Sequence, residues 1–183
     1  MSRIHQISPE NTTGKSAELF TAVKGKLGMV PNMMRAIANS PAALGAYLQF
    51  SGGLADGSLS NQQREQIALA VGEANQCDYC LAAHSALGKM AGLSPNQIRD
   101  ARHGSAVDAK NDSLVRFARK LVNERGHVTT EDLQELRDHG FTDGDVAEVV
   151  ANVALNIFTN YFNHVADPDI DFPRAECLTC KVA

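Results

Sequence analysis

Apolar residues recur every three or four positions along most of this chain, which is the spacing of one face of an α-helix. The segment 15–28 shows the pattern clearly, and its apolar face is formed by Leu19, Phe20, Val23 and Leu27. Runs of alternating β-branched residues are absent, and no segment has the pattern of a hairpin. The pattern predicts a single all-α domain of about seven to nine helices.

Capping residues mark where several of these helices begin. Serine or threonine is followed three residues later by a residue that can complete the cap. These pairs are Ser60 with Gln63, Ser94 with Gln97, Thr129 with Asp132, and Thr142 with Asp145. Ser40 followed by Pro41 gives a further start. The helix that begins after Ser60 carries five consecutive apolar residues, 67–71, so we expect it to be buried on most sides.

The last helix is predicted over about 143–165 and is mostly apolar, as expected of a core helix or a subunit interface. Asparagines at 152, 156 and 160 fall on one face of it, and Asn163 and His164 continue that face. They either hydrogen-bond across an interface, line a polar channel, or form an exposed polar face. Met33 and Met34, in a short apolar segment at 32–39, either fill the core or line an apolar pocket.

Proline divides the chain into two parts after this helix. We predict a helical domain over residues 1–166 and an irregular C-terminal tail over 167–183, which contains Pro168 and Pro173. The net charge of -4 and the lack of a Lys- and Arg-rich run predict no nucleic-acid or membrane partner. The N-terminus shows no signal peptide or anchor, so we expect a cytoplasmic protein.

All four cysteines fall into two C-x-x-C pairs, Cys77 with Cys80 and Cys177 with Cys180. In a reducing compartment such pairs indicate redox chemistry or metal binding more often than structural disulfides. We expect Cys77 to begin a helix, where free N–H groups favour the thiolate. The second pair lies in the tail, where it either reduces the first pair as a mobile dithiol or has no function.

Two further side chains can complete a thiol redox site. His84 follows Cys80 by four residues and therefore lies on the same face of the helix. Glu65 lies on the preceding helix and reaches the imidazole only if the two helices pack antiparallel, as their short connection favours. The imidazole would then take the thiol proton, and the carboxylate would orient the imidazole.

These residues lead to two hypotheses from different classes. In the first, Cys80 attacks a hydroperoxide and becomes a sulfenic acid, Cys77 condenses with it to a disulfide, and an external dithiol restores the pair. In the second, C-x-x-C-x-x-x-H binds zinc or senses redox state without catalysis, with Cys177 or Cys180 as a fourth ligand. Glu65 alone also fits the common role of an acidic residue that complements the dipole at the N-terminus of its helix.

The combination of Glu65, the segment Cys77-Asp78-Tyr79-Cys80, and His84 resembles the carboxymuconolactone decarboxylase / AhpD-like alkylhydroperoxidase family. The resemblance extends over about 30–105 and continues through the asparagine-rich last helix. It implies an AhpD-like helical fold that assembles into trimers or hexamers. It also implies that Cys80 attacks the peroxide, that Cys77 resolves it, and that Glu65 and His84 relay protons.

Tyr79 stands where the best-known peroxidases of that family carry a second histidine. A tyrosine is a poor base at neutral pH, so we expect it at most to orient a water or the sulfur. The sequence therefore predicts a thiol-dependent peroxidase with catalytic residues Cys80, Cys77, His84, Glu65 and Tyr79. The prediction includes no cofactor or metal; the expected partners are a hydroperoxide, a dithiol or thioredoxin-like reductant, and further copies of the chain.

Overall fold

The computed structural model describes residues 2–178, which contain nine α-helices and no strand. The all-α prediction is therefore confirmed for this part of the chain. The helices are α1 Gly14–Leu27, α2 Asn32–Ile37, α3 Pro41–Ala55, α4 Asn61–Ala74, α5 Asp78–Met90, α6 Pro95–His103, α7 Ala109–Asn123, α8 Thr130–Asp138 and α9 Asp143–Ala166.

The predicted caps form as the sequence indicates. The capping boxes at Ser60, Ser94, Thr129 and Thr142 all have both reciprocal hydrogen bonds, and the Ser40 hydroxyl accepts from the N–H of Ala43. Each box satisfies two N–H groups that a helix terminus otherwise leaves unpaired. Local sequence therefore sets these helix starts independently of the tertiary packing.

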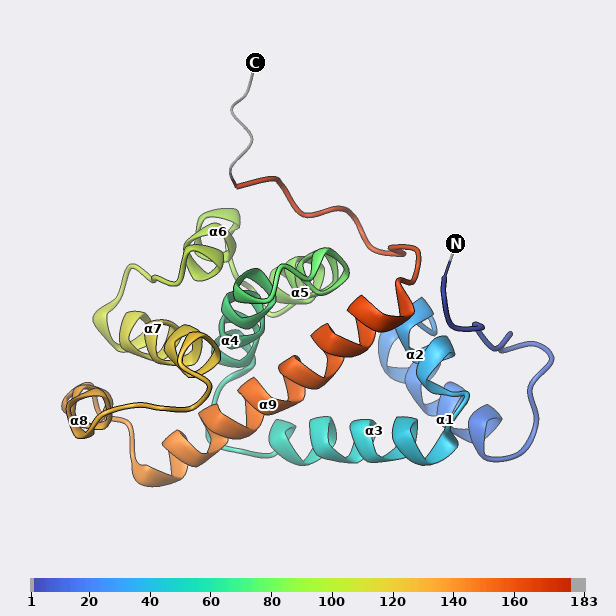
Figure 1. Cartoon of the computed structure of the whole chain (residues 1–183), viewed down its shortest axis with the longest axis horizontal. Coiled ribbons are helices and arrows are strands. Elements are labelled where there is room, and N and C mark those ends of the chain that lie inside the picture. The colour runs from blue at the N-terminus through green and yellow to red at the C-terminus, as the bar shows by residue number, and fades with distance from the viewer. Residues whose placement is uncertain (1, 179–183) are drawn as a thin grey trace, which may run out of the picture.

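Helix α4 is the centre of the molecule. It packs against α5, α6, α7 and α9, and its residues 66–72 are all buried. Figure 1 shows α4 with α5, α6 and α7 grouped on one side of the long helix α9, and α1, α2 and α3 on the other. The predicted burial of this helix on most sides is confirmed.

Helix α9 is oriented with its asparagines inward. Asn152, Asn156, Asn160 and Asn163 are at most 5% exposed, which excludes one of the three alternatives for them, an exposed polar face. Val150, Phe158, Tyr161 and Val165 are exposed on the other side, at 42–62%. The polar face is buried because it packs on α4 and α5, where it finds polar and sulfur partners.

After Ala166 the chain forms no regular element through residue 178. It turns back from the end of α9 and runs along the α5 and α6 side of the molecule (Figure 1). Arg102, a buried side chain of α6, donates to the carbonyl of Glu176 at 2.7 Å and pairs with Glu73 of α4 at 2.7 Å. Within residues 2–178 no helix is long and apolar enough to cross a membrane.

Leu69 shows how strongly the central helix depends on its packing. Its side chain is fully buried and packs with Leu93, Ile98 and Ala101 around α6. We expect Leu69→Ala to lower the free energy of unfolding by about 2–5 kcal/mol, because it removes buried methyl groups and leaves a cavity. Urea unfolding checks this, and Val107→Ala, at an 88% exposed position, is the control that should change it little.

Candidate redox site

The cysteine pair lies at the turn between α4 and α5. Gln76 closes α4 in the left-handed conformation, with φ of 55°, and the N–H of Cys77 donates to the carbonyl of Gly72 at 2.9 Å. This is the hydrogen bond of a Schellman turn, usually made with glycine at the left-handed position. Asn75 anchors the turn by donating its amide to Asn160 Oδ1 of α9 at 2.9 Å.

Cys77 and Cys80 are joined in a disulfide, with their Cα atoms 5.3 Å apart. Cys77 is the N-cap of α5, so the predicted helix begins one residue after it, at Asp78. The Cys77 sulfur accepts from the backbone N–H of Cys80 at 3.3 Å. In the reduced protein the same geometry would favour a thiolate at Cys77, because N–H groups and the positive end of the helix dipole face the sulfur.

The structure brings Glu65 and His84 together. Glu65 Oε2 lies 2.9 Å from His84 Nδ1, and both side chains are about one-fifth exposed. This contact exists because α4 and α5 pack side by side after the short turn. With Nδ1 held by the carboxylate, Nε2 is the ring nitrogen left to exchange a proton with another group.

Cys80 and His84 line one apolar cavity of about 220 Å³. Its walls come from five helices, α1, α2, α3, α5 and α9, and from the C-terminal segment, and they include Met33, Met34, Tyr47, Leu87, Met90 and Phe172. Met33 and Met34 therefore belong both to the buried core and to the wall of a pocket. A cavity with this lining favours a ligand with an apolar body.

Cys77 lines a different cavity. This polar cavity, of about 530 Å³, lies between the start of α5, the end of α9 and residues 167–174, and it includes Gln76, Asp78, His164, Asp169 and Arg174. Cys80 does not line it, and Cys77 does not line the apolar cavity. The two sulfurs of one disulfide are therefore next to two chemically different openings.

The hydroxyl of Tyr79 is engaged by α2 and by the C-terminal segment. The hydroxyl donates to Asp171 Oδ1 at 2.6 Å and accepts from the N–H of Met33 at 3.2 Å. Its ring meets Phe172 edge-on. Burial raises the pKa of Tyr79, and the bond to Asp171 raises it further. In this geometry the residue joins α5 to α2 and to the C-terminal segment.

Sequence reasoning missed Tyr47 of α3 and gave Asn163 of α9 no chemical role. Tyr47 lines the apolar cavity, and burial together with the charge of Glu65 raises the pKa of its hydroxyl to about 12. It is therefore a hydrogen-bond donor at neutral pH. Asn163 donates to Cys80 Sγ at 3.2 Å. Neither has a local motif, because each reaches the site from a distant helix.

The second C-x-x-C is only partly placed. Cys177 is exposed and lines a cavity with Arg102 and Glu176, while Cys180 lies outside the described residues. Within residues 2–178 no group of three His, Cys, Asp or Glu side chains is arranged to hold a metal ion. The described geometry thus brings together Glu65 with His84, and Cys77 with Cys80, without a zinc cluster around them.

We expect Tyr79→Phe to lower the free energy of unfolding by about 1–3 kcal/mol. The substitution leaves the N–H of Met33 without its acceptor and removes the bond to Asp171. Chemical unfolding measures the loss, and hydrogen exchange should rise around residues 167–172. Tyr161→Phe, which removes an exposed hydroxyl, is the control. An unchanged unfolding curve for Tyr79→Phe would contradict the structural role of this hydroxyl.

Comparisons with known proteins agree with this fold. Residues 41–124, from α3 to α7, match the model of the carboxymuconolactone decarboxylase family. No curated protein matches the chain significantly.

Several solved structures share the fold. An AhpD-core, peroxidase-related protein from Ralstonia eutropha JMP134 is 26% identical, with a TM-score of 0.85 over 93% of this chain and 92% of that one. A peroxidase-related protein from Silicibacter sp. TM1040 is 27% identical, with a TM-score of 0.78 over 86% of each chain.

The debrominase Bmp8, solved with 2,3,4-tribromopyrrole, is 16% identical, with a TM-score of 0.80 over 93% of this chain and 92% of its own. At this identity the similarity shows a common fold alone. Residues 41–124 are thus similar to the carboxymuconolactone decarboxylase family, and the chain has an AhpD-like fold with a C-x-x-C pair.

Proposed function

We propose that this protein is a thiol-dependent peroxidase that reduces organic hydroperoxides through Cys80 and Cys77. The observation that supports this most is that Cys80 and His84 line one apolar cavity, with Glu65 bonded to Nδ1 of the imidazole. The AhpD-like fold is consistent with the proposal but does not select the reaction, because a debrominase has the same fold.

In the reduced protein, His84 takes the proton of the Cys80 thiol, and Glu65 stabilises the imidazolium that results. The Cys80 thiolate attacks the terminal oxygen of the hydroperoxide, and the O–O bond breaks. The alkoxide leaves and takes the proton back from His84, so that the products are an alcohol and Cys80 sulfenic acid. The apolar cavity holds the alkyl part of the substrate during this step.

Cys77 then resolves the sulfenic acid. Its thiolate attacks Cys80 Sγ, the S–S bond forms, and hydroxide leaves and is protonated to water. The N-cap position of Cys77 supports this step, because the helix terminus favours its thiolate. The resulting Cys77–Cys80 disulfide is the state described above.

An external dithiol completes the cycle. Its thiolate attacks Cys77 from the polar cavity, and Cys80 leaves as a thiolate; the second thiol of the reductant then releases Cys77 and closes its own disulfide. The overall reaction converts a hydroperoxide and a dithiol into an alcohol, water and a disulfide. The separate openings beside Cys80 and Cys77 are consistent with oxidant and reductant approaching from different sides.

The proposal is tested by peroxide consumption under excess dithiol. Cys80→Ser and Cys77→Ser should both abolish turnover, and Cys80→Ser should also abolish sulfenic acid formation. Glu65→Gln should lower kcat/KM by roughly 10- to 100-fold, because it removes the carboxylate that orients the imidazole. Removing the hydrogen-bond partner of a metal-bound histidine has an effect of this size. Glu124→Gln, at the C-cap of α7, is a control for the loss of a surface carboxylate.

The alternative is a non-catalytic protein that uses the same cysteines to sense redox state or to bind zinc. Stoichiometric zinc in the purified protein, with no peroxide consumption under excess dithiol, would support this alternative and contradict the peroxidase. A metal-free protein that consumes peroxide only with both cysteines present would exclude it.

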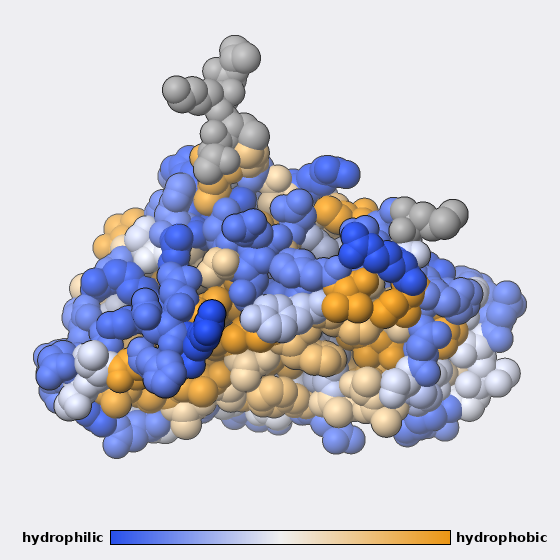
Figure 2. Space-filling view, viewed as in Figure 1, coloured by the Kyte–Doolittle hydropathy of each residue, from blue (hydrophilic) through white to orange (hydrophobic). Residues whose placement is uncertain are grey.

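We further infer that the chain forms homo-oligomers through the outward face of α9. Phe158, Tyr161 and Val165 are 42–62% exposed there, and Phe50 of α3 is 43% exposed. Figure 2 shows an apolar band over the part of the surface where Figure 1 places α3 and α9. Apolar side chains of this size, gathered on one surface, are typical of an interface between subunits.

The double variant Tyr161→Glu, Val165→Glu should therefore shift a trimer or hexamer to the monomer, because it places charges in an apolar contact. Light scattering after size exclusion measures the mass, and circular dichroism checks that the helices persist. Val107→Glu, at an exposed position before α7, is the matched control. If the wild-type chain is monomeric at micromolar concentration, the inference is wrong.

A further inference from the structure

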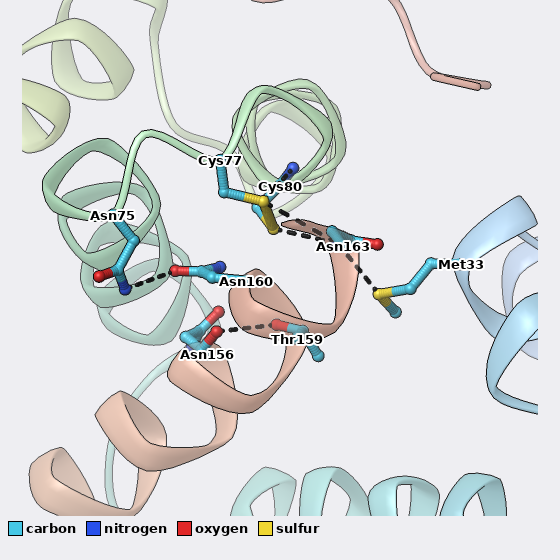
Figure 3. Close-up of a disulfide and its surroundings, with 8 residues drawn as sticks. All are labelled: Met33, Asn75, Cys77, Cys80, Asn156, Thr159, Asn160 and Asn163. Atoms are coloured by element: carbon cyan, nitrogen blue, oxygen red, sulfur yellow. Dashed lines mark hydrogen bonds between the residues drawn. A yellow bond between two sulfur atoms is a disulfide. The ribbon is translucent and has the colours of Figure 1, made fainter. Parts of the chain in front are cut away.

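One polar side chain touches the cysteine pair from across the molecule. Asn163, near the end of α9 and only 4% exposed, places its amide nitrogen 3.2 Å from Cys80 Sγ and 3.9 Å from Cys77 Sγ. The same nitrogen lies 3.3 Å from the sulfur of Met33. Figure 3 shows the amide nitrogen between these sulfurs, with the amide oxygen directed away from the disulfide.

We propose that Asn163 is a further catalytic residue, whose amide donates a hydrogen bond to Cys80 Sγ and stabilises the charge on that sulfur. The proposal rests on the proposed function, in which Cys80 carries a negative charge twice. It is a thiolate when it attacks the hydroperoxide, and it is the leaving thiolate when the reductant opens the disulfide. A donor on this one sulfur accelerates both halves of the cycle.

Cys80 needs such a donor because the start of its helix serves the other cysteine. The backbone N–H of Cys80 points to Cys77 Sγ at 3.3 Å, so Cys77 has the N-terminal position that favours a thiolate. Cys80 is 3% exposed, and a charged sulfur that is buried without a donor is costly. The Asn163 amide is a neutral donor that is present at every step of the cycle. His84 cannot take this role, because it gains and loses its proton during the cycle.

The other asparagines of α9 have ordinary partners. The amide nitrogens of Asn152 and Asn156 donate to carbonyls one turn earlier, both at 2.8 Å, and Asn160 accepts from Asn75. Asn163 differs, because its amide nitrogen goes to sulfur atoms; its buried oxygen, like the amide nitrogen of Asn160, has no hydrogen-bond partner among the described residues.

The experiment measures the ionisation of Cys80 directly. In a background in which Cys77, Cys177 and Cys180 are replaced by serine, Cys80 is the only thiol in the chain. The ultraviolet absorbance of the thiolate, followed against pH, gives the midpoint of its ionisation. Asn163→Leu should raise this midpoint by about one pH unit, the size expected when one hydrogen bond to a charged group is lost.

Three variants make the result specific. Asn163→Asp places a carboxylate at the same position and should raise the midpoint at least as far as Asn163→Leu. Asn163→Ser keeps a small donor and should restore part of the wild-type value. Asn152→Leu repeats the substitution on the same face without a sulfur contact, and its midpoint should equal that of the wild type.

Thermal unfolding shows which variants are folded. If Asn163→Leu is unfolded, the ionisation midpoints of Asn163→Ser and Asn163→Asp test the proposal instead. A wild-type midpoint in the folded Asn163 variants would overturn the proposal for Asn163. That outcome is separate from failure of the proposed function, which appears as no peroxide consumption by a wild-type protein whose Cys80 titrates normally. In an active enzyme, Asn163→Leu should lower the rate constant for peroxide reaction by roughly ten-fold.

Discussion

The contact between the asparagine face of α9 and the turn joining α4 to α5 is the interaction on which the rest of the site depends. It places a hydrogen-bond donor on Cys80 through Asn163 and anchors the turn through Asn160 and Asn75. Each of the four asparagines has at least one partner, which offsets part of the cost of burying a polar face. The site and the core are therefore parts of the same packing arrangement.

This inward orientation of the asparagines has a consequence on the opposite side of α9. The helix has both polar and large apolar residues, so burying the polar face exposes the apolar one. The exposed residues then favour contact with further copies of the chain. The chemistry of the cysteine pair and the proposed assembly are thus linked through the rotation of one helix about its axis.

The site also separates two tasks between two sulfurs. Cys80 lies with His84 on an apolar cavity, and Cys77 lies at a helix N-terminus beside a polar cavity. Tyr79, between them in sequence, fastens the C-terminal segment beside the polar cavity through Asp171. Tyr79 is in this way part of the scaffold of the site. In the proposed cycle, the proton relay then depends on Glu65 and His84.

Much of this protein follows from local sequence. Capping boxes and helical periodicity are local properties, so the helix starts and the all-α class could be predicted, as could the shared face of Cys80 and His84. The contact between Glu65 and His84 could be predicted only on the condition that their two helices pack antiparallel. Tertiary structure alone decided that Asn163 meets Cys80, that the Tyr79 hydroxyl meets Asp171, and which face of α9 is buried. The first two contacts join residues 83 and 92 positions apart in the chain, and no local pattern encodes them. The buried face of α9 depends on whether its polar or its apolar side finds the better partners in the folded protein.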